Sequence, residues 1–112
     1  MEMNRAVDAL SALAHDGRLA IYRLLMQAGP QGLTVGRIAK KLDMPGATLS
    51  FHLSALKHAG LVRAERRGRE LIQTADFLCM NNLVGYLTEN CCNGDATACA
   101  PGAVSVPKRR RA

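Results

Sequence analysis

The sequence lacks any apolar run long enough to cross a bilayer, which takes about 20 residues in a helix. It shows no secretory signal, because Met1-Glu2-Met3-Asn4-Arg5 leads into an amphipathic stretch rather than a continuously apolar one. No spacing of serine, cysteine and histidine suggests a nucleophile with its base, and no phosphate-cradling glycine loop follows a strand pattern. These absences predict a cytoplasmic protein that has no membrane partner, is not an enzyme and requires no cofactor.

Cysteine is scarce, with 4 in 112 residues. In a reducing compartment such cysteines are more often free thiols or metal ligands than a disulfide framework. The charge is unbalanced: 15 Lys and Arg stand against 9 Asp and Glu, which gives a formal net charge of +6. That sign is expected of a phosphate-binding surface. A chain of this length has room for one domain with a modest core, so we expect dimerisation to add burial.

Residues 33–69 carry the most informative pattern. A short helical pattern precedes a break at Pro45 and Gly46, and a second helical pattern then leads into two strand-like runs around a basic turn. One face of the second helix is apolar and must be buried. The opposite face and its flank hold small, polar and basic side chains that suit a major groove, although a merely solvated face would show the same periodicity. Its members are Ala47, Ser50, Phe51, Ser54, Lys57 and His58.

The basic turn follows this helix directly. Residues 61–65 alternate apolar and polar side chains, and residues 71–74 have the pattern of a return strand. The tract between them predicts a hairpin with Arg66, Arg67 and Arg69 at its tip. Guanidinium groups bind phosphate bidentately, so the turn favours a DNA-binding wing over a turn that is only solvated.

Two helical patterns come before this unit. Val7, Leu10 and Ala14 share a face of the first, at core or interface positions, and the second ends at Gly29-Pro30. Thr34 is a predicted N-cap of the next helix, since its hydroxyl can accept a backbone amide hydrogen. His15 is expected to be a structural residue at a corner.

Five segments resemble the ArsR/SmtB family of metal-sensing bacterial repressors: residues 12–21, 33–39, 48–53, 56–62 and 67–69. The resemblance covers about residues 5–90. It implies a mainly α winged helix-turn-helix fold with five helices and a two-stranded wing, which forms a homodimer on operator DNA. Residues 1–92 would form the DNA-binding and dimerisation domain. Residues 93–112 would be a flexible tail with a ligand-binding cysteine and a basic end.

As a repressor of this kind, the chain would use the outward residues of its helix over residues 46–58 in the following way. Phe51 would contact a thymine methyl group, and hydrogen bonds to base edges would come from Ser50, His52 and Ser54. Lys57 and the wing arginines would hold phosphates. Two copies would set their recognition helices about 34–36 Å apart, one turn of a palindromic operator.

The segment 76–90 is apolar on two sides. One stripe comprises Phe77, Met80, Val84 and Leu87, and the other comprises Cys79, Leu83 and Tyr86. A helix with two apolar faces needs two partners, so we expect one face to pack on its own domain and the other on the same helix of a second copy. Cys79 is then a packed thiol rather than a ligand.

Cys91, Cys92 and Cys99 carry the chemical signal. Asn93-Gly94 can reverse the chain after the last helix, so that Cys99 folds back over the adjacent pair. Soft thiolates select thiophilic centres; trivalent arsenic or antimony takes three sulfurs, whereas structural zinc normally takes four ligands. We therefore predict a three-cysteine site for As(III), or for Sb(III), whose occupation releases the repressor from DNA.

The chain departs from two ligand sets of the family. Val35-Gly36-Arg37 stands where arsenic-sensing members often carry Cys-x-Cys. Asp76 remains from the zinc site of the fifth helix, but Leu78 and Glu89 stand where histidines are needed. Some arsenic sensors of the family place their cysteines after this helix, as this chain does with Cys91, Cys92 and Cys99. Four alternatives stay open: cysteines without a ligand role, a thiol-redox repressor pairing Cys91 or Cys92 with Cys99, a zinc, cadmium or lead sensor, and an arsenic-binding enzyme or carrier unrelated to transcription.

Overall fold

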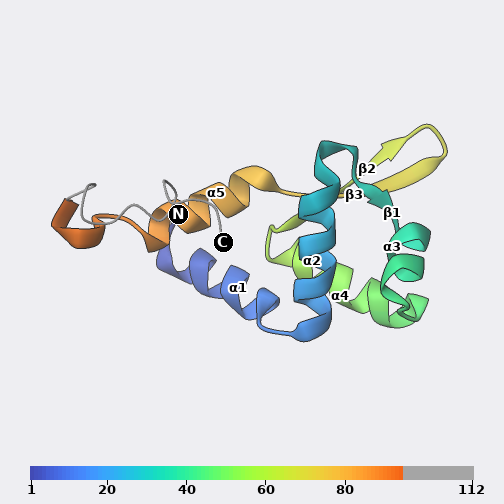
Figure 1. The fold of residues 1–112 in the computed structure, drawn as a ribbon, viewed down its shortest axis with the longest axis horizontal. Coiled ribbons are helices and arrows are strands. Elements are labelled where there is room, and N and C mark those ends of the chain that lie inside the picture. Colours follow the sequence, from blue (N-terminus) through green and yellow to red (C-terminus); the bar gives the residue numbers. More distant parts are fainter. Residues whose placement is uncertain (95–112) are drawn as a thin grey trace, which may run out of the picture.

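The computed structural model describes residues 1–94, so Cys99 and the basic end of the chain lie outside the described residues. The elements are α1 (Met3–Leu13), α2 (Asp16–Ala28), η1 (Gly29–Gln31), β1 (Leu33–Thr34), α3 (Val35–Leu42), α4 (Gly46–His58), β2 (Val62–Arg67), β3 (Glu70–Ala75), α5 (Phe77–Leu87) and η2 (Cys91–Gly94) (Figure 1). The predicted winged helix-turn-helix with five α-helices is confirmed. None of the helices within residues 1–94 is long and apolar enough to span a membrane.

The sheet has one strand more than predicted. Its order is β1-β3-β2, all antiparallel, with Leu33 opposite Gln73 and Thr34 opposite Ile72. A strand of two residues is too short to give an alternating pattern, so β1 could not be recognised from the sequence. Thr34 ends β1 and also caps α3, because its Oγ1 accepts a hydrogen bond from the Arg37 N–H at 3.3 Å. This predicted cap is confirmed, and it joins the start of α3 to the base of the wing.

The helix α2 ends where the sequence indicated, and it begins at the predicted corner residue His15. His15 is its N-cap, and its Nδ1 accepts a hydrogen bond from the Gly17 N–H at 3.1 Å. The helix ends at Gly29, whose φ of +75° is accessible to glycine at little cost. Gly32 allows a still closer approach, because a Cβ there would lie 2.4 Å from the Gln73 carbonyl oxygen. The two glycines thus bring the end of α2 against β3.

The core fixes which side of α4 faces outward. Side chains of α2, α3, α4 and the α4–β2 turn are fully buried together: Ile21, Leu25, Ile38, Leu49, Leu56 and Leu61. Burial of one such aliphatic side chain stabilises a fold by about 1.5–3 kcal/mol. Leu49, Leu53 and Leu56 supply the predicted apolar face of α4 and anchor it. The opposite face of the helix is therefore presented to solvent.

The first helix packs through a face that its sequence pattern did not single out. Its buried residues are Ala6, Ala9 and Ala12. Val7 and Leu10 are exposed instead. They were expected in the core or at an interface, and their exposure excludes the core. The small alanines let α1 lie close to its neighbours, while the larger side chains face outward.

Candidate nucleic-acid interface and cysteine site

The helix α4 presents the predicted reading surface. α3 ends at Asp43, which adopts the left-handed conformation with φ +52°, and α4 begins after Pro45. Phe51 is 65% exposed, so its ring is available for an apolar contact. Its neighbours on this surface, Ser50, Ser54 and Lys57, are exposed as well. The surface thus offers an apolar ring, two hydroxyls and a cation from one helix.

His52 does not belong to this surface, since its side chain is only 7% exposed. Its Nδ1 accepts a hydrogen bond from Arg18 Nε at 3.3 Å, and its ring centroid lies 4.6 Å from that of His15. Burial, and then the charges of His15 and Arg18, lower the pKa of His52 below its ordinary value. The predicted hydrogen bond from His52 to a base edge does not fit this burial, so we remove it from the contact set.

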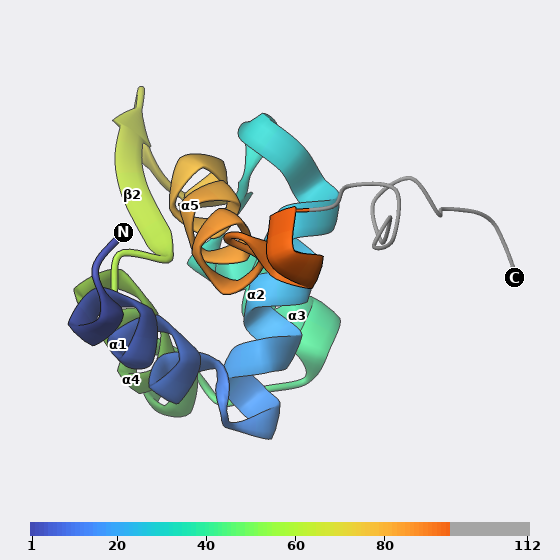
Figure 2. The same ribbon diagram turned by 90° about the vertical axis from the view of Figure 1, so that its left-hand side faces the viewer.

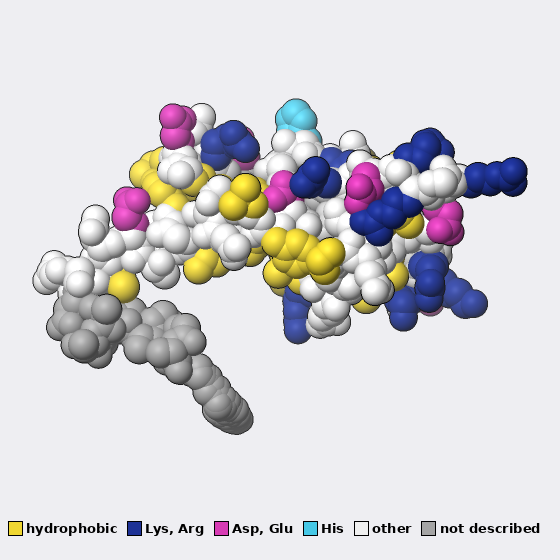
Figure 3. Space-filling model, turned by 90° about the horizontal axis from the view of Figure 1, so that it is seen from above, with side chains coloured by type: hydrophobic (Ala, Val, Ile, Leu, Met, Phe, Trp, Pro, Cys, Tyr) yellow, Lys and Arg dark blue, Asp and Glu magenta, His cyan; other side chains and the backbone are white. Residues whose placement is uncertain are grey.

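The wing is longer and its turn tighter than the sequence suggested. The strands run to Arg67 and from Glu70, so only Gly68 and Arg69 form the turn, with Gly68 at φ +64°. Arg66 lies at the end of β2 rather than in the turn. The side chains of Arg66 and Arg69 are exposed, and the structure gives these side chains no hydrogen bond or ion pair with any residue in 1–94. Lys and Arg side chains gather at this end of the molecule (Figure 3).

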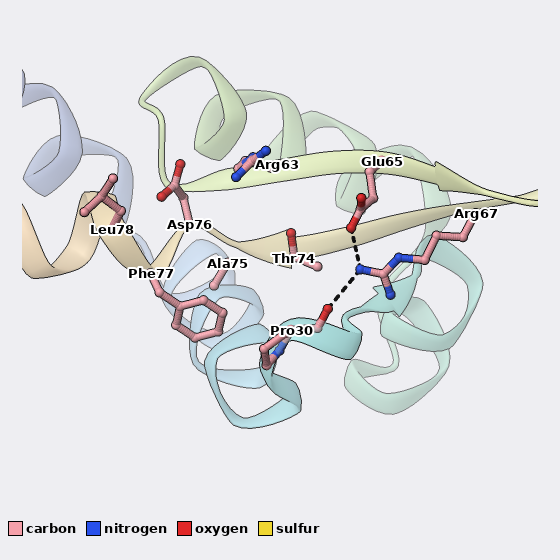
Figure 4. Close-up of a pocket in the computed structure, with 9 residues that line it drawn as sticks. All are labelled: Pro30, Arg63, Glu65, Arg67, Thr74, Ala75, Asp76, Phe77 and Leu78. Carbon is pink, nitrogen blue, oxygen red and sulfur yellow. Dashed lines mark hydrogen bonds and ion pairs between the residues drawn. The ribbon is translucent and has the colours of Figure 1, made fainter.

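Arg67 is turned back toward the domain. Its terminal nitrogens donate hydrogen bonds to the backbone oxygens of Gln31 and Pro30, each at 2.9 Å. It also pairs with Glu65, and Figure 4 shows the contacts to Pro30 and Glu65. A guanidinium that is occupied in this way is poorly placed to hold a phosphate. We therefore correct its expected role: Arg67 ties the wing to η1, which follows α2, while Arg66 and Arg69 stay the predicted phosphate contacts of the wing.

A salt titration separates these two roles. We expect the double substitution Arg66→Ala and Arg69→Ala to weaken binding to every DNA sequence, since phosphate contacts carry no sequence information. The slope of log K against log[salt] should fall in magnitude by about 0.9 for each phosphate that is no longer neutralised. Arg67→Ala should lower thermal stability more than the double variant does, and change the slope less. Fluorescence anisotropy at several salt concentrations measures both slopes, and an unchanged slope in the double variant would exclude the wing from the interface.

The cysteine pair lies in η2, where the backbone departs from helical geometry. Asn90, Cys92, Asn93 and Gly94 all have φ between +53° and +84°, a conformation that asparagine and glycine adopt most readily. Cys91 is half-buried and Cys92 is exposed. Within residues 1–94 no group of three His, Cys, Asp or Glu side chains could hold a metal ion. Since Cys99 lies outside the described residues, the convergence of three thiols stays a prediction.

Cys79 is a packed thiol, as the sequence predicted. It lies half-buried against the core, and its backbone N–H donates a 3.0 Å hydrogen bond to Oδ1 of Asp76, the N-cap of α5. Burial and then the Asp76 carboxylate raise the pKa of the Cys79 thiol, which Arg5 offsets only in part. A thiol that stays protonated is a weak nucleophile and a weak metal ligand. Asp76, the remnant of the family's zinc site, serves here as a helix cap.

The helices α1 and α5 share an exposed apolar face. Its large side chains are Met3, Val7 and Leu10 from α1 and Val84 and Leu87 from α5, while Leu78 is exposed on the side of α5 opposite Leu87. Figure 2 looks onto this end of the molecule, where α1 and α5 lie side by side. The two predicted stripes of α5 are correct in part: Leu83 is buried inward, but Phe77 and Met80 also contact the core. An apolar face of this kind, which we call the α1/α5 face, is typical of a protein–protein interface.

Comparisons with known proteins agree with this geometry. Residues 13–65 match the model of a helix-turn-helix domain. The chain is 36% identical to the uncharacterized HTH-type transcriptional regulator MJ1325 of Methanocaldococcus jannaschii, over 57% of this chain and 70% of that protein. It is 33% identical to the transcriptional activator HlyU of Vibrio cholerae, over 66% of this chain and 68% of that protein.

Solved structures extend the likeness to the whole fold. Reduced HlyU superposes with a TM-score of 0.58 at 26% identity and covers 80% of this chain and 90% of its own. The homodimeric winged helix-turn-helix domain of Mb0332 from Mycobacterium bovis, described as a possible ArsR-family regulator, superposes with a TM-score of 0.62 at 31% identity. That match covers 79% of this chain and 82% of the other. The chain therefore belongs to the winged helix-turn-helix transcriptional regulators of the ArsR and HlyU type, which bind DNA.

Proposed function

We propose that this chain is a homodimeric repressor that leaves its operator when trivalent arsenic, or antimony, binds Cys91, Cys92 and Cys99. The observation that carries the proposal is the adjacent cysteine pair in η2, just after α5, where Cys92, Asn93 and Gly94 all have positive φ. A reversal at this point would bring a later cysteine toward the pair. The site needs reduced thiols, so we propose a cytoplasmic protein.

The donor set favours a trigonal thiophilic centre. All three histidines of the sequence belong to α4 or to the cap of α2, and neither element leads into η2. Cys79 is a weak fourth donor, because burial keeps its thiol protonated. Three sulfurs without nitrogen suit As(III) or Sb(III) better than structural zinc, which normally has four ligands.

The α1/α5 face supports the homodimer. Mb0332, a relative of the same fold, is described as homodimeric. Two copies that pair through α5 would carry the cysteine pairs at the ends of their interface helices, so a ligand there would change the relative placement of the protomers. It can release DNA only if it binds the free form more tightly than the DNA-bound form, and a coupling of about 1–3 kcal/mol is typical.

The proposed contact set on DNA follows from exposure. Phe51 would contact a thymine methyl group, and Ser50 and Ser54 would bind base edges. Phosphates would be held by Lys57, Arg66 and Arg69. In a dimer, the two copies of α4 would enter successive major grooves about 34–36 Å apart.

A mobility-shift assay on the DNA upstream of the protein's own gene tests the proposal. Reduced protein should retard this DNA, and arsenite should release it. Zinc at the same concentration should have little effect. Retarded DNA that arsenite leaves bound would refute the arsenic site but not the DNA-binding function. Failure to retard the DNA at all would count against an operator at this position.

A redox sensor is the second candidate, since Cys92 is an exposed thiol and the relative HlyU has been described in a reduced form. Two thiols would form one disulfide and give two protons and two electrons to one peroxide, which is thereby reduced to two water molecules. Release by peroxide with formation of that disulfide, and no response to arsenite under reducing conditions, would favour this function.

A further inference from the structure

A groove lies between α4 and the corner at which α1 meets α2. Phe51, Ser54 and His58 line it from α4, while Arg18 lines it from α2 and Asp8 from α1. Phe51 and Ser54 belong to the proposed reading surface. The groove therefore borders the place where a DNA major groove would be engaged, and the strand at the edge of that major groove would pass along it.

Arg18 is held in this groove by two contacts. Its Nε donates the hydrogen bond to His52 Nδ1, and its Cζ lies 5.9 Å from the centre of the Phe51 ring. No residue in 1–94 accepts a hydrogen bond from its two terminal nitrogens. A planar guanidinium fixed through Nε keeps its outer edge for a bidentate contact, and less rotamer entropy is lost when that contact forms.

We propose that Arg18 is a further DNA-binding residue that clamps a phosphate beside the major groove, and that His52 is the positioning residue that aims it. The inference rests on the proposed reading role of α4 and is independent of the cysteine site. A DNA strand is the occupant that the charges favour, because the groove continues the reading surface and Arg18 offers an unpaired cation. Asp8 on the α1 wall would repel phosphate, which restricts the strand to the Arg18 side.

The surroundings of His52 explain why Nδ1 points at Arg18. The His15 ring packs on one side of the imidazole, and α2 lies so close that a Cβ at Gly17 would be 3.1 Å from His52 Nε2. His52 has little room to rotate, so its acceptor nitrogen stays where the Arg18 Nε–H can reach it. An exposed histidine at this position would not hold the arginine in one orientation.

This arrangement requires a neutral His52. Nδ1 accepts the hydrogen bond only without a proton, and the lowered pKa of His52 keeps it unprotonated at neutral pH. The titratable and charged groups around it are His15 and Arg18, from the cap of α2 and from α2, with Asp8 from α1 and His58 from α4 lining the same groove. As pH falls through the His52 pKa, the hydrogen bond is lost and two cations face each other. The Arg18 contribution to DNA binding should then disappear.

The first test is a salt titration with a matched control. Arg18→Ala should reduce the slope of log K against log[salt] by about 0.9 per phosphate, or about 1.8 for a dimer, on operator and unrelated duplexes alike. Arg23→Ala removes an exposed arginine from the same helix and should leave the slope unchanged. Arg18→Gln keeps an amide donor for His52 without the charge, and it serves if the alanine variant does not fold. Equal slopes for the Arg18 and Arg23 variants would overturn the proposal.

The second test is a pH profile, which a merely structural role of His52 would not move. His52→Asn keeps an acceptor near the Nδ1 position but does not titrate, so it should bind DNA at neutral pH and lose less affinity than the wild type on acidification. His52→Leu should show the reduced salt slope of Arg18→Ala. Identical acid profiles for the wild type and His52→Asn, with a normal salt slope for His52→Leu, would show that His52 only fills space. If the wild type binds no DNA, the proposed function itself fails, rather than this clamp.

Discussion

Cys91→Ser, Cys92→Ser and Cys99→Ser are each expected to bind the operator as the wild type does and to remain bound when arsenite is added. The cysteine pair lies at one end of the molecule and the wing at the other, so a conservative change at the pair leaves the reading surface intact (Figure 1). A hydroxyl oxygen is a poor ligand for a soft centre, so each substitution should sharply weaken arsenic binding. Mobility shift with increasing arsenite measures the loss of release.

Cys79→Ser is the matched control for these variants. Its thiol is packed against the core rather than exposed, so we expect a modest loss of stability from a buried hydroxyl and a normal response to arsenite. X-ray absorption on the wild-type complex should find three sulfur neighbours around arsenic and no nitrogen. Normal release of the three tail variants by arsenite would refute the three-thiol site. A Cys79 variant that no longer responds would instead place the sensor on the inner side of α5.

The proposed coupling from the cysteines to the DNA would run along α5. β3 ends at Ala75, Asp76 caps α5, and η2 follows the helix within a few residues. The Asp76 N–H also donates a 2.8 Å hydrogen bond to the Leu61 carbonyl, at the turn between α4 and β2. A displacement of α5 is therefore passed both to the wing and to the end of the reading helix. This is the kind of contiguous packed element through which two sites can bias one equilibrium.

Sequence periodicity predicted α4 and β2 because the apolar side chains of each lie on one well-defined face. Leu49, Leu53 and Leu56 define α4 in this way, and the alternation after Leu61 defines β2. β1 was missed because two residues carry no period. The conformation of Arg67 depends on carbonyls 36 and 37 residues away in sequence, and no local pattern reports such an interaction.

The candidate site was predictable where exposure follows from helical position, as for Ser50, Phe51 and Ser54. The predicted exposure of His52 was wrong because His52 lies next to Leu53, at the edge of the buried face of α4. At such an edge the neighbouring helix decides whether a side chain is covered. The burial of Gln73 in the sheet could not be predicted from the sequence either. Its side chain is fully buried, and its side-chain amide has no hydrogen-bond partner within residues 1–94. Polar residues of this kind are normally expected at the surface.

Leu87→Glu should convert the protein into a folded monomer with greatly reduced operator affinity. Leu87 is 56% exposed on the α1/α5 face, so the charge is tolerated in a single copy but would be buried in the dimer. Burying an unpaired carboxylate costs several kcal/mol in real proteins. A monomer engages one half-site only, so the second half-site adds nothing to its affinity. Sedimentation velocity measures the mass, and anisotropy measures binding to a two-half-site duplex.

Two leucines serve as controls because they differ from Leu87 in surroundings rather than in chemistry. Leu83 is 2% exposed on the inner side of α5, so Leu83→Glu should unfold the domain instead of separating two folded copies. Leu71 is exposed on the wing, so Leu71→Glu should sediment as a dimer even though a charge near the arginines disturbs DNA binding. Val84→Glu should repeat the monomeric result of Leu87→Glu from a neighbouring position. If both the Leu87 and Val84 variants remain dimeric, the partner is held by another surface, and the coupling from the cysteines through paired α5 helices must be abandoned.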